Sequence, residues 1–139
     1  ENYFEIYPSF PLHRMPSFFI HADVLLVSLL NEDVFNMTIP GKVQFYLSSG
    51  KPIIGMLNGE GAEVINTSSA GFTCNSGEYL KLSKLIIKVI NMEKSELISL
   101  GNNGKAYSKK HFLKSQLMQR LQKIIIDTTN KYYLKNQKD

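Results

Sequence analysis

The fold is decided by residues 22–57, which read ADVLLVSLLNEDVFNMTIPGKVQFYLSSGKPIIGML. Two apolar, β-branched runs, at residues 23–29 and 52–57, are typical of buried strands. Between them, residues 41–49 place their apolar side chains at the spacing of one helix face. Because a strand, a helix and a second strand follow one another at this interval, the stretch predicts a βαβ unit with parallel strands.

The same alternation extends to both sides of this stretch. Strands are also expected at residues 3–7 and, more weakly, at residues 71–74. The remaining helices are expected at residues 15–21, 78–92, 95–100 and 108–134, with a Gly-Asn-Asn-Gly turn at residues 101–104. The predicted fold is therefore α/β, a Rossmann-like parallel sheet of about four strands flanked by helices, with a helical C-terminal tail. Because the strands are apolar throughout, helices should cover both faces of the sheet.

Length and composition fit one compact domain. The chain has 139 residues, of which 43% are hydrophobic, enough to build a core. Its longest apolar run, residues 24–30, is too short to span a bilayer. The single cysteine, Cys74, lies in an apolar run, which predicts a buried, unreactive thiol in a reducing cytoplasm. Because the chain begins at Glu1, we expect it to be cut from a longer protein.

The net charge of +4 is concentrated in the last third of the chain. Basic residues there are Lys105, Lys109, Lys110, Lys114, Arg120, Lys123, Lys131, Lys135 and Lys138. Leucines and isoleucines at helical spacing accompany them, so the lysines are interpreted as the wet face of a packed helix. No nucleic-acid partner is expected, because no arginine–aromatic or zinc pattern is present. The chain is divided into an α/β domain at residues 1–107 and a basic amphipathic helix at residues 108–139. This helix packs on the domain or on an absent N-terminal domain.

Open parallel sheets bind ligands beyond the carboxyl ends of their strands, which directs attention to the loop after residue 29. Thr38 is the expected N-cap of the next helix, and Pro40 fits its first turn. The N–H groups of Gly41 and Lys42, the helix dipole and the lysine charge then form an anion site suited to a diphosphate. The alternative is an ordinary capped helix with a solvated lysine.

The loop after residue 57 is the second candidate. Gly59 and Gly61 flank Glu60, which allows a tight backbone beside a ligand and places the carboxylate where sugar hydroxyls could donate to it. Glu60 could equally be a plain loop residue. Glu63 is interpreted as a first-turn acid that favours the helix dipole.

Several blocks, in order and at matching spacing, carry a resemblance to a known family. Residues 22–54, with TIPGKVQFYLSSGKPII, and NGEGAEVI at residues 58–65 resemble the C-terminal domain of GT-B glycosyltransferases, close to family 4. GNNGKAY at residues 101–107 resembles the closing helices of that domain, and the TIPGK opening resembles that of bacterial members. The resemblance implies a nucleotide-sugar donor, a retaining transfer and no cofactor or obligatory metal.

The same resemblance supplies the candidate site residues. It implies that Thr38, Gly41, Lys42, Gly59, Glu60 and Gly61 bind the donor. Many members carry two glutamates seven residues apart on this loop and helix. Counting back from the Gly-Lys-Pro, the second position is Phe45, which excludes a ribose contact of the usual kind. The first falls nearest Glu32 or Asp33, and these two are the catalytic candidates.

The expected function is therefore the donor-binding half of a glycosyltransferase, inactive without its N-terminal acceptor domain. The first βα units of the family's C-terminal domain are also expected to be missing. The acceptor would be a glycan or lipid-linked glycan, in the cytoplasm or at the inner membrane face, with peripheral membrane contact. The alternative is a non-catalytic flavodoxin-like or receiver-like module. Only Glu32 and Asp33 approach a receiver's acidic cluster, and no Gly-X-Gly-X-X-Gly turn favours a dinucleotide.

Overall fold

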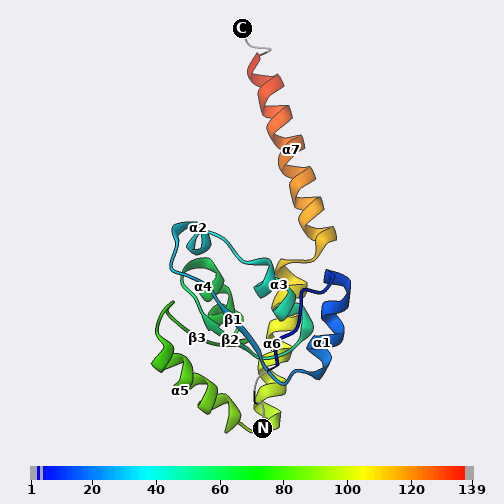
Figure 1. Ribbon diagram of the computed structural model, residues 1–139. Coiled ribbons are helices and arrows are strands. Elements are labelled where there is room, and N and C mark those ends of the chain that lie inside the picture. Colours follow the sequence, from blue (N-terminus) through cyan, green and yellow to red (C-terminus); the bar gives the residue numbers. More distant parts are fainter. Residues whose placement is uncertain (1–2, 4, 137–139) are drawn as a thin grey trace.

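The computed structural model describes residues 3 and 5–136, with side chains described as far as residue 132 (Figure 1). In chain order the elements are η1, a 3-10 helix (Leu12–Arg14), α1 (Met15–His21), β1 (Leu25–Ser28), α2 (Asp33–Asn36), α3 (Gly41–Ser49), β2 (Ile53–Met56), α4 (Gly59–Thr67), β3 (Gly71–Cys74), α5 (Tyr79–Ile90), α6 (Lys94–His111) and α7 (Lys114–Asn136). The α/β class is thus confirmed.

The sheet is parallel and has three strands in the order β1–β2–β3, not about four. Ile53 of β2 pairs with Leu25 of β1 and with Gly71 of β3, which fixes the register. The strand expected at residues 3–7 is wrong, because its described residues lie outside any helix or strand and are exposed. Tyr7 instead contacts Phe10 and Phe18 in a local cluster of rings at the start of α1.

Helices cover the sheet in two layers. Thr73 of β3 points to the α4 side, where its hydroxyl donates to the Asn66 Oδ1 at 3.0 Å. Phe72, one residue earlier, points to the opposite side, where the Lys88 ammonium of α5 lies 3.8 Å from its ring centroid. The helices α3 and α4, which connect successive strands, therefore lie on one face, and α5 lies on the other.

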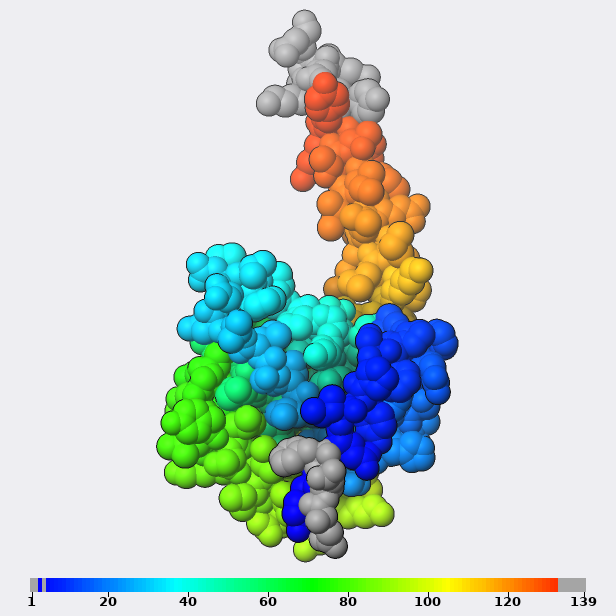
Figure 2. All heavy atoms as spheres, viewed as in Figure 1, coloured from blue at the N-terminus to red at the C-terminus, as the bar shows by residue number. Residues whose placement is uncertain are grey.

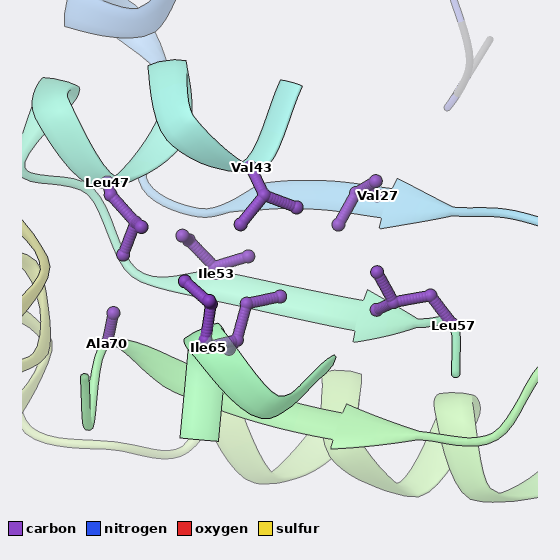
Figure 3. Packing of buried hydrophobic residues seen from close by; sticks show 8 residues of the cluster. Val27, Val43, Leu47, Ile53, Leu57, Ile65 and Ala70 are labelled. Atoms are coloured by element: carbon purple, nitrogen blue, oxygen red, sulfur yellow. The ribbon is translucent and has the colours of Figure 1, made fainter. Parts of the chain in front are cut away.

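The core fills the space between the sheet and its α3–α4 layer. Figure 3 shows Val43 and Leu47 of α3 facing Ile53 of β2 and Ile65 of α4. All four side chains are fully buried. Burying them stabilises the fold by about 1.5–3 kcal/mol for each side chain. The strand–helix–strand unit predicted from residues 22–57 is thus the centre of the molecule.

The glycine-rich turn expected at residues 101–104 is wrong, because α6 runs through it without a break. Gly101 and Gly104 are buried there. A Cβ on Gly101 would lie 2.0 Å from the Gly50 carbonyl oxygen, and one on Gly104 would lie 3.2 Å from Leu47 Cδ2. These glycines therefore allow α6 to approach α3 and the turn that follows it.

Helices do not cover both faces of every strand. β2 is largely buried, whereas Leu26 of β1 is 49% exposed on the side away from α3. Within the described chain, β1 pairs with β2 alone and forms an edge of the sheet. The Tyr46 hydroxyl of α3 donates to the Leu26 carbonyl at 3.4 Å, and burial raises the pKa of this phenol. The expectation that helices cover the whole sheet was therefore wrong for β1.

The tail differs from the long helix expected at residues 108–134. α6 ends at His111, residues 112 and 113 form a link, and α7 begins at Lys114. Every described α7 side chain is exposed, and the helix projects from the body (Figures 1 and 2). The described α7 side chains therefore do not pack on the α/β body, and packing of this helix on an absent N-terminal domain stays a prediction. Tyr132, near its far end, is 65% exposed. No described helix is long and apolar enough to cross a membrane.

Candidate functional site

The loops that follow the three strands are joined by hydrogen bonds through Asn58. Its Nδ2 donates to Asn31 Oδ1 at 3.3 Å, and its Oδ1 accepts the Ser76 N–H at 2.7 Å. The Ser76 hydroxyl donates to the Leu29 carbonyl at 2.8 Å, and Asn36 Nδ2 donates to Asn31 Oδ1 at 2.9 Å. The carboxyl edge of the sheet is therefore a connected platform.

Helix α3 begins at this platform, but its cap is not the one expected. Pro40 occupies the N-cap position, and its carbonyl accepts the Val43 N–H at 2.9 Å. Thr38 is not the N-cap, because its hydroxyl donates to the Val34 carbonyl at 2.9 Å and so closes α2. The N–H groups of Gly41 and Lys42 precede the first intrahelical bond. A Cβ on Gly41 would meet no atom within 4 Å, so an anion has room to approach.

Helix α4 begins beside α3, and its glycines serve internal packing. Gly59 has a φ of +66°, and a Cβ there would lie 2.0 Å from the Asn36 carbonyl oxygen. A Cβ on Gly61 would lie 2.9 Å from Pro40 Cδ. This close approach places the N-termini of α3 and α4 side by side. Glu60, expected in a loop, is an exposed residue of the first turn of α4.

The two catalytic candidates lie at the same end of the sheet. Glu32 is the residue before α2 and Asp33 is its first residue, and both are exposed. Asn36 of the same helix lies against Gly59, so α2 adjoins α4. The structure therefore gathers the predicted residues along one edge.

An apolar hollow of about 370 Å³ lies next to the start of α3. Its lining residues are Phe10, Leu12, Met15, Phe19, Gly41, Lys42, Phe45 and Tyr46. Phe45, where the sequence resemblance would place a glutamate, is thus part of an apolar surface between α1 and α3.

A polar hollow of about 480 Å³ lies beyond the ends of β2 and β3. Asn58, Gly59, Glu63, Asn66, Thr73, Asn75, Glu78 and Lys81 are among its lining residues. Amides, hydroxyls and carboxylates of this kind can hydrogen-bond sugar hydroxyls. Four of these residues were not among the predicted site residues: Asn66, Thr73, Asn75 and Lys81. The loop after the strand at residues 71–74 could have been predicted as part of the site, because ligands bind beyond the carboxyl ends of parallel strands.

Electrostatics in the polar hollow centre on Glu78. Its Oε1 lies 2.5 Å from the Lys81 Nζ, and its Oε2 accepts the Asn75 N–H at 2.8 Å. The lysine first, and then the backbone N–H, lower the pKa of the Glu78 carboxyl. Burial, and then the nearby Glu78 charge, raise the pKa of the Cys74 thiol. Cys74 is buried and unpaired, as predicted for an unreactive thiol.

In the part of the chain that the structure describes, no three His, Cys, Asp or Glu residues form a group that could hold a metal ion.

A three-stranded parallel sheet with its candidate residues beyond the carboxyl ends of the strands belongs to the Rossmann-like architectures. The chain is similar to a protein of Pseudomonas aeruginosa described as the probable glycosyltransferase WbjE, with 31% identity over 79 residues. That match covers 55% of this chain and 19% of the relative. The chain is thus distantly related to a probable glycosyltransferase, and the match spans about a fifth of that protein's length. No family profile and no solved structure matches.

Proposed function

We propose that the chain is the donor-binding half of a retaining GT-B glycosyltransferase, similar to family 4. It takes a sugar from a nucleoside diphosphate sugar and delivers it to a glycan or lipid-linked acceptor. The observation that carries this proposal is the similarity to the probable glycosyltransferase. A second domain supplies the acceptor site, and transfer needs no cofactor or obligatory metal.

The paired N-termini of α3 and α4 support a location for the donor. The diphosphate lies at the start of α3, where the N–H groups of Gly41 and Lys42 and the lysine charge meet. The sugar extends toward Glu60 on α4 and the polar hollow beside it. Glu32 or Asp33 supplies a carboxylate that stabilises positive charge developing on the sugar ring.

Titration with uridine and guanosine diphosphates tests this location. The chain should bind one of them weakly, because half of a cleft supplies only part of the contacts. Lys42→Ala should weaken binding by about 1–3 kcal/mol, the range for losing a hydrogen bond to a charged group. Calorimetry gives the affinity, and circular dichroism checks that the variant is folded.

Lys84→Ala is the matched control. Lys84 is also exposed, but it belongs to α5 on the opposite face of the sheet, so its loss should leave the affinity unchanged. Equal affinities for the Lys42→Ala variant and the unmodified chain would place the diphosphate elsewhere. Robust sugar transfer by residues 1–139 alone would contradict the requirement for a second domain.

A further inference from the structure

One side of α4 forms a wall of the polar hollow that lies beyond the ends of β2 and β3. Four residues of the helix line the hollow and recur at the spacing of a single helix side: Gly59, Ala62, Glu63 and Asn66. The first two are small, so they leave space between the helix and the opposite wall. Glu63 and Asn66, three residues apart, therefore present the polar side-chain groups of this wall.

Hydrogen bonds hold both walls of the hollow in place. On the α4 wall, the Thr73 hydroxyl donates to Asn66 Oδ1 at 3.0 Å, which leaves the amide nitrogen to donate elsewhere. On the opposite wall, the Glu78 carboxylate accepts the Asn75 N–H at 2.8 Å and forms an ion pair with Lys81. A ligand therefore meets groups that are already oriented, which reduces the entropy lost on binding.

Two polar groups of the α4 wall have no partner in the part of the chain that the structure describes. The Glu63 carboxylate makes no hydrogen bond or ion pair there, and the Asn66 amide nitrogen makes no hydrogen bond. Both side chains are exposed, so a ligand in the hollow can reach them. A carboxylate accepts hydrogen bonds and an amide N–H donates them, whereas a sugar hydroxyl can do both. Neighbouring hydroxyls of one sugar ring therefore match this pair.

The charge of the hollow is negative. Glu63 and Glu78 line it, against Lys81. The lysine first, and then a backbone N–H, lower the pKa of the Glu78 carboxyl, so this group stays ionised. Because Lys81 is paired with Glu78, it does not neutralise Glu63. A ligand group that carries a carboxylate is therefore repelled from the hollow, whereas a hydroxyl group is not.

We propose that this hollow selects an uncharged hexose on the donor and rejects a hexuronic acid, with Glu63 and Asn66 as the residues that determine this specificity. The inference rests on the proposed function, in which the diphosphate of the donor lies at the start of α3. The hollow adjoins that location, because Gly59 lines it and a Cβ on Gly61 would lie 2.9 Å from Pro40 Cδ. Glu63 accepts a hydrogen bond from one sugar hydroxyl, and Asn66 donates to the next.

Affinities for two pairs of nucleotide sugars test the proposal. UDP-glucose and UDP-glucuronic acid differ in the carboxylate of the sugar, and GDP-mannose and GDP-mannuronic acid give the same comparison for guanosine. With the nucleotide that binds, the chain should bind the neutral sugar about five- to tenfold more tightly, because like charges lie close together in the acidic complex. Glu63→Gln should bring the two affinities together, because it removes the unpaired charge. Ligand-detected NMR measures weak affinities of this kind.

Asp127→Asn is the matched control. It removes the same charge from an exposed acid of α7, which projects from the body, so the preference for the neutral sugar should persist. Glu63→Gln should fold, because the Glu63 side chain is exposed, and circular dichroism checks this.

Two results would overturn the inference alone: equal affinities for neutral and acidic sugars in the unmodified chain, or a preference that persists in Glu63→Gln. In both cases the nucleotide still binds, so the proposed function stands. Absence of binding by uridine and guanosine diphosphates and by all four nucleotide sugars would overturn the proposed function, and this inference with it.

Discussion

Two glycines in α6 determine how closely that helix can approach the body. A methyl group on Gly101 would lie 2.0 Å from the Gly50 carbonyl oxygen, a distance that backbone atoms cannot accommodate without movement. Glycine is disfavoured within helices by about 1 kcal/mol relative to alanine. Close packing against α3 therefore outweighs local propensity at this position.

Gly101→Ala should lower the free energy of unfolding by about 1–3 kcal/mol, because overpacking forces α6 away from α3. Gly41→Ala is the control. It adds the same methyl group at a position where no atom lies within 4 Å, so stability should change by less than about 0.5 kcal/mol. Urea unfolding curves measure both. A Gly101→Ala variant as stable as the unmodified chain would show that α6 packs more loosely than described.

The rate at which the Cys74 thiol reacts should depend on pH. Thiolate is the reactive form, and the raised pKa keeps Cys74 protonated at a pH where a free peptide thiol has begun to ionise. Alkylation by iodoacetamide should therefore be slow near neutral pH, and its rate should rise at higher pH than for a short cysteine peptide. Labelling as fast as in the peptide at every pH would contradict the buried environment.

At the scale of elements, α7 contributes little to the stability of the body, because none of its described side chains is buried. Deleting residues 114–139 should change the free energy of unfolding by less than about 0.5 kcal/mol. Thermal and urea unfolding of the shortened chain provide the measurement. A large loss of stability would mean that α7 packs on the α/β body.

Elements whose signal is local could be predicted from the sequence, and elements that depend on distant contacts could not. Helix α3 was predicted with its observed bounds, because its apolar face and flanking glycine lie within residues 41–50. The turn predicted at residues 101–104 was wrong because Gly101 and Gly104 serve contacts with Gly50 and Leu47, about 50 residues earlier in the chain. The prediction of a strand at residues 3–7 was wrong because an apolar run forms a strand only where another strand pairs with it.

The candidate site, too, could be predicted only in part. That ligands gather beyond the strand ends follows from the parallel sheet, and the predicted residues do lie along that edge. The link from Asn58 to Asn31 and Ser76 could not be predicted, because it depends on how three separate loops meet. The roles of the predicted site residues in donor binding and catalysis stay predictions.

At the scale of the whole molecule, the protein consists of an α/β body with balanced charge and a basic arm, α7, that projects from it (Figure 1). The excess of basic residues in the last third of the chain is evident from the sequence, and its pattern predicted the solvent-facing side of a packed helix. In the structure every described α7 side chain is exposed instead, the apolar ones as well as the charged ones.

The edge strand β1 has a consequence for the behaviour of the purified protein. Leu25 and Leu29 direct their N–H groups to the β2 side, so the backbone groups of Leu26 and Ser28 point away from β2. Of these groups, the Leu26 carbonyl accepts a hydrogen bond from the Tyr46 hydroxyl. An edge with a neighbouring exposed leucine is a template on which a foreign strand can add. Its length of four residues limits such growth. Fibrils or crystals that form from concentrated stocks are expected to grow through this edge.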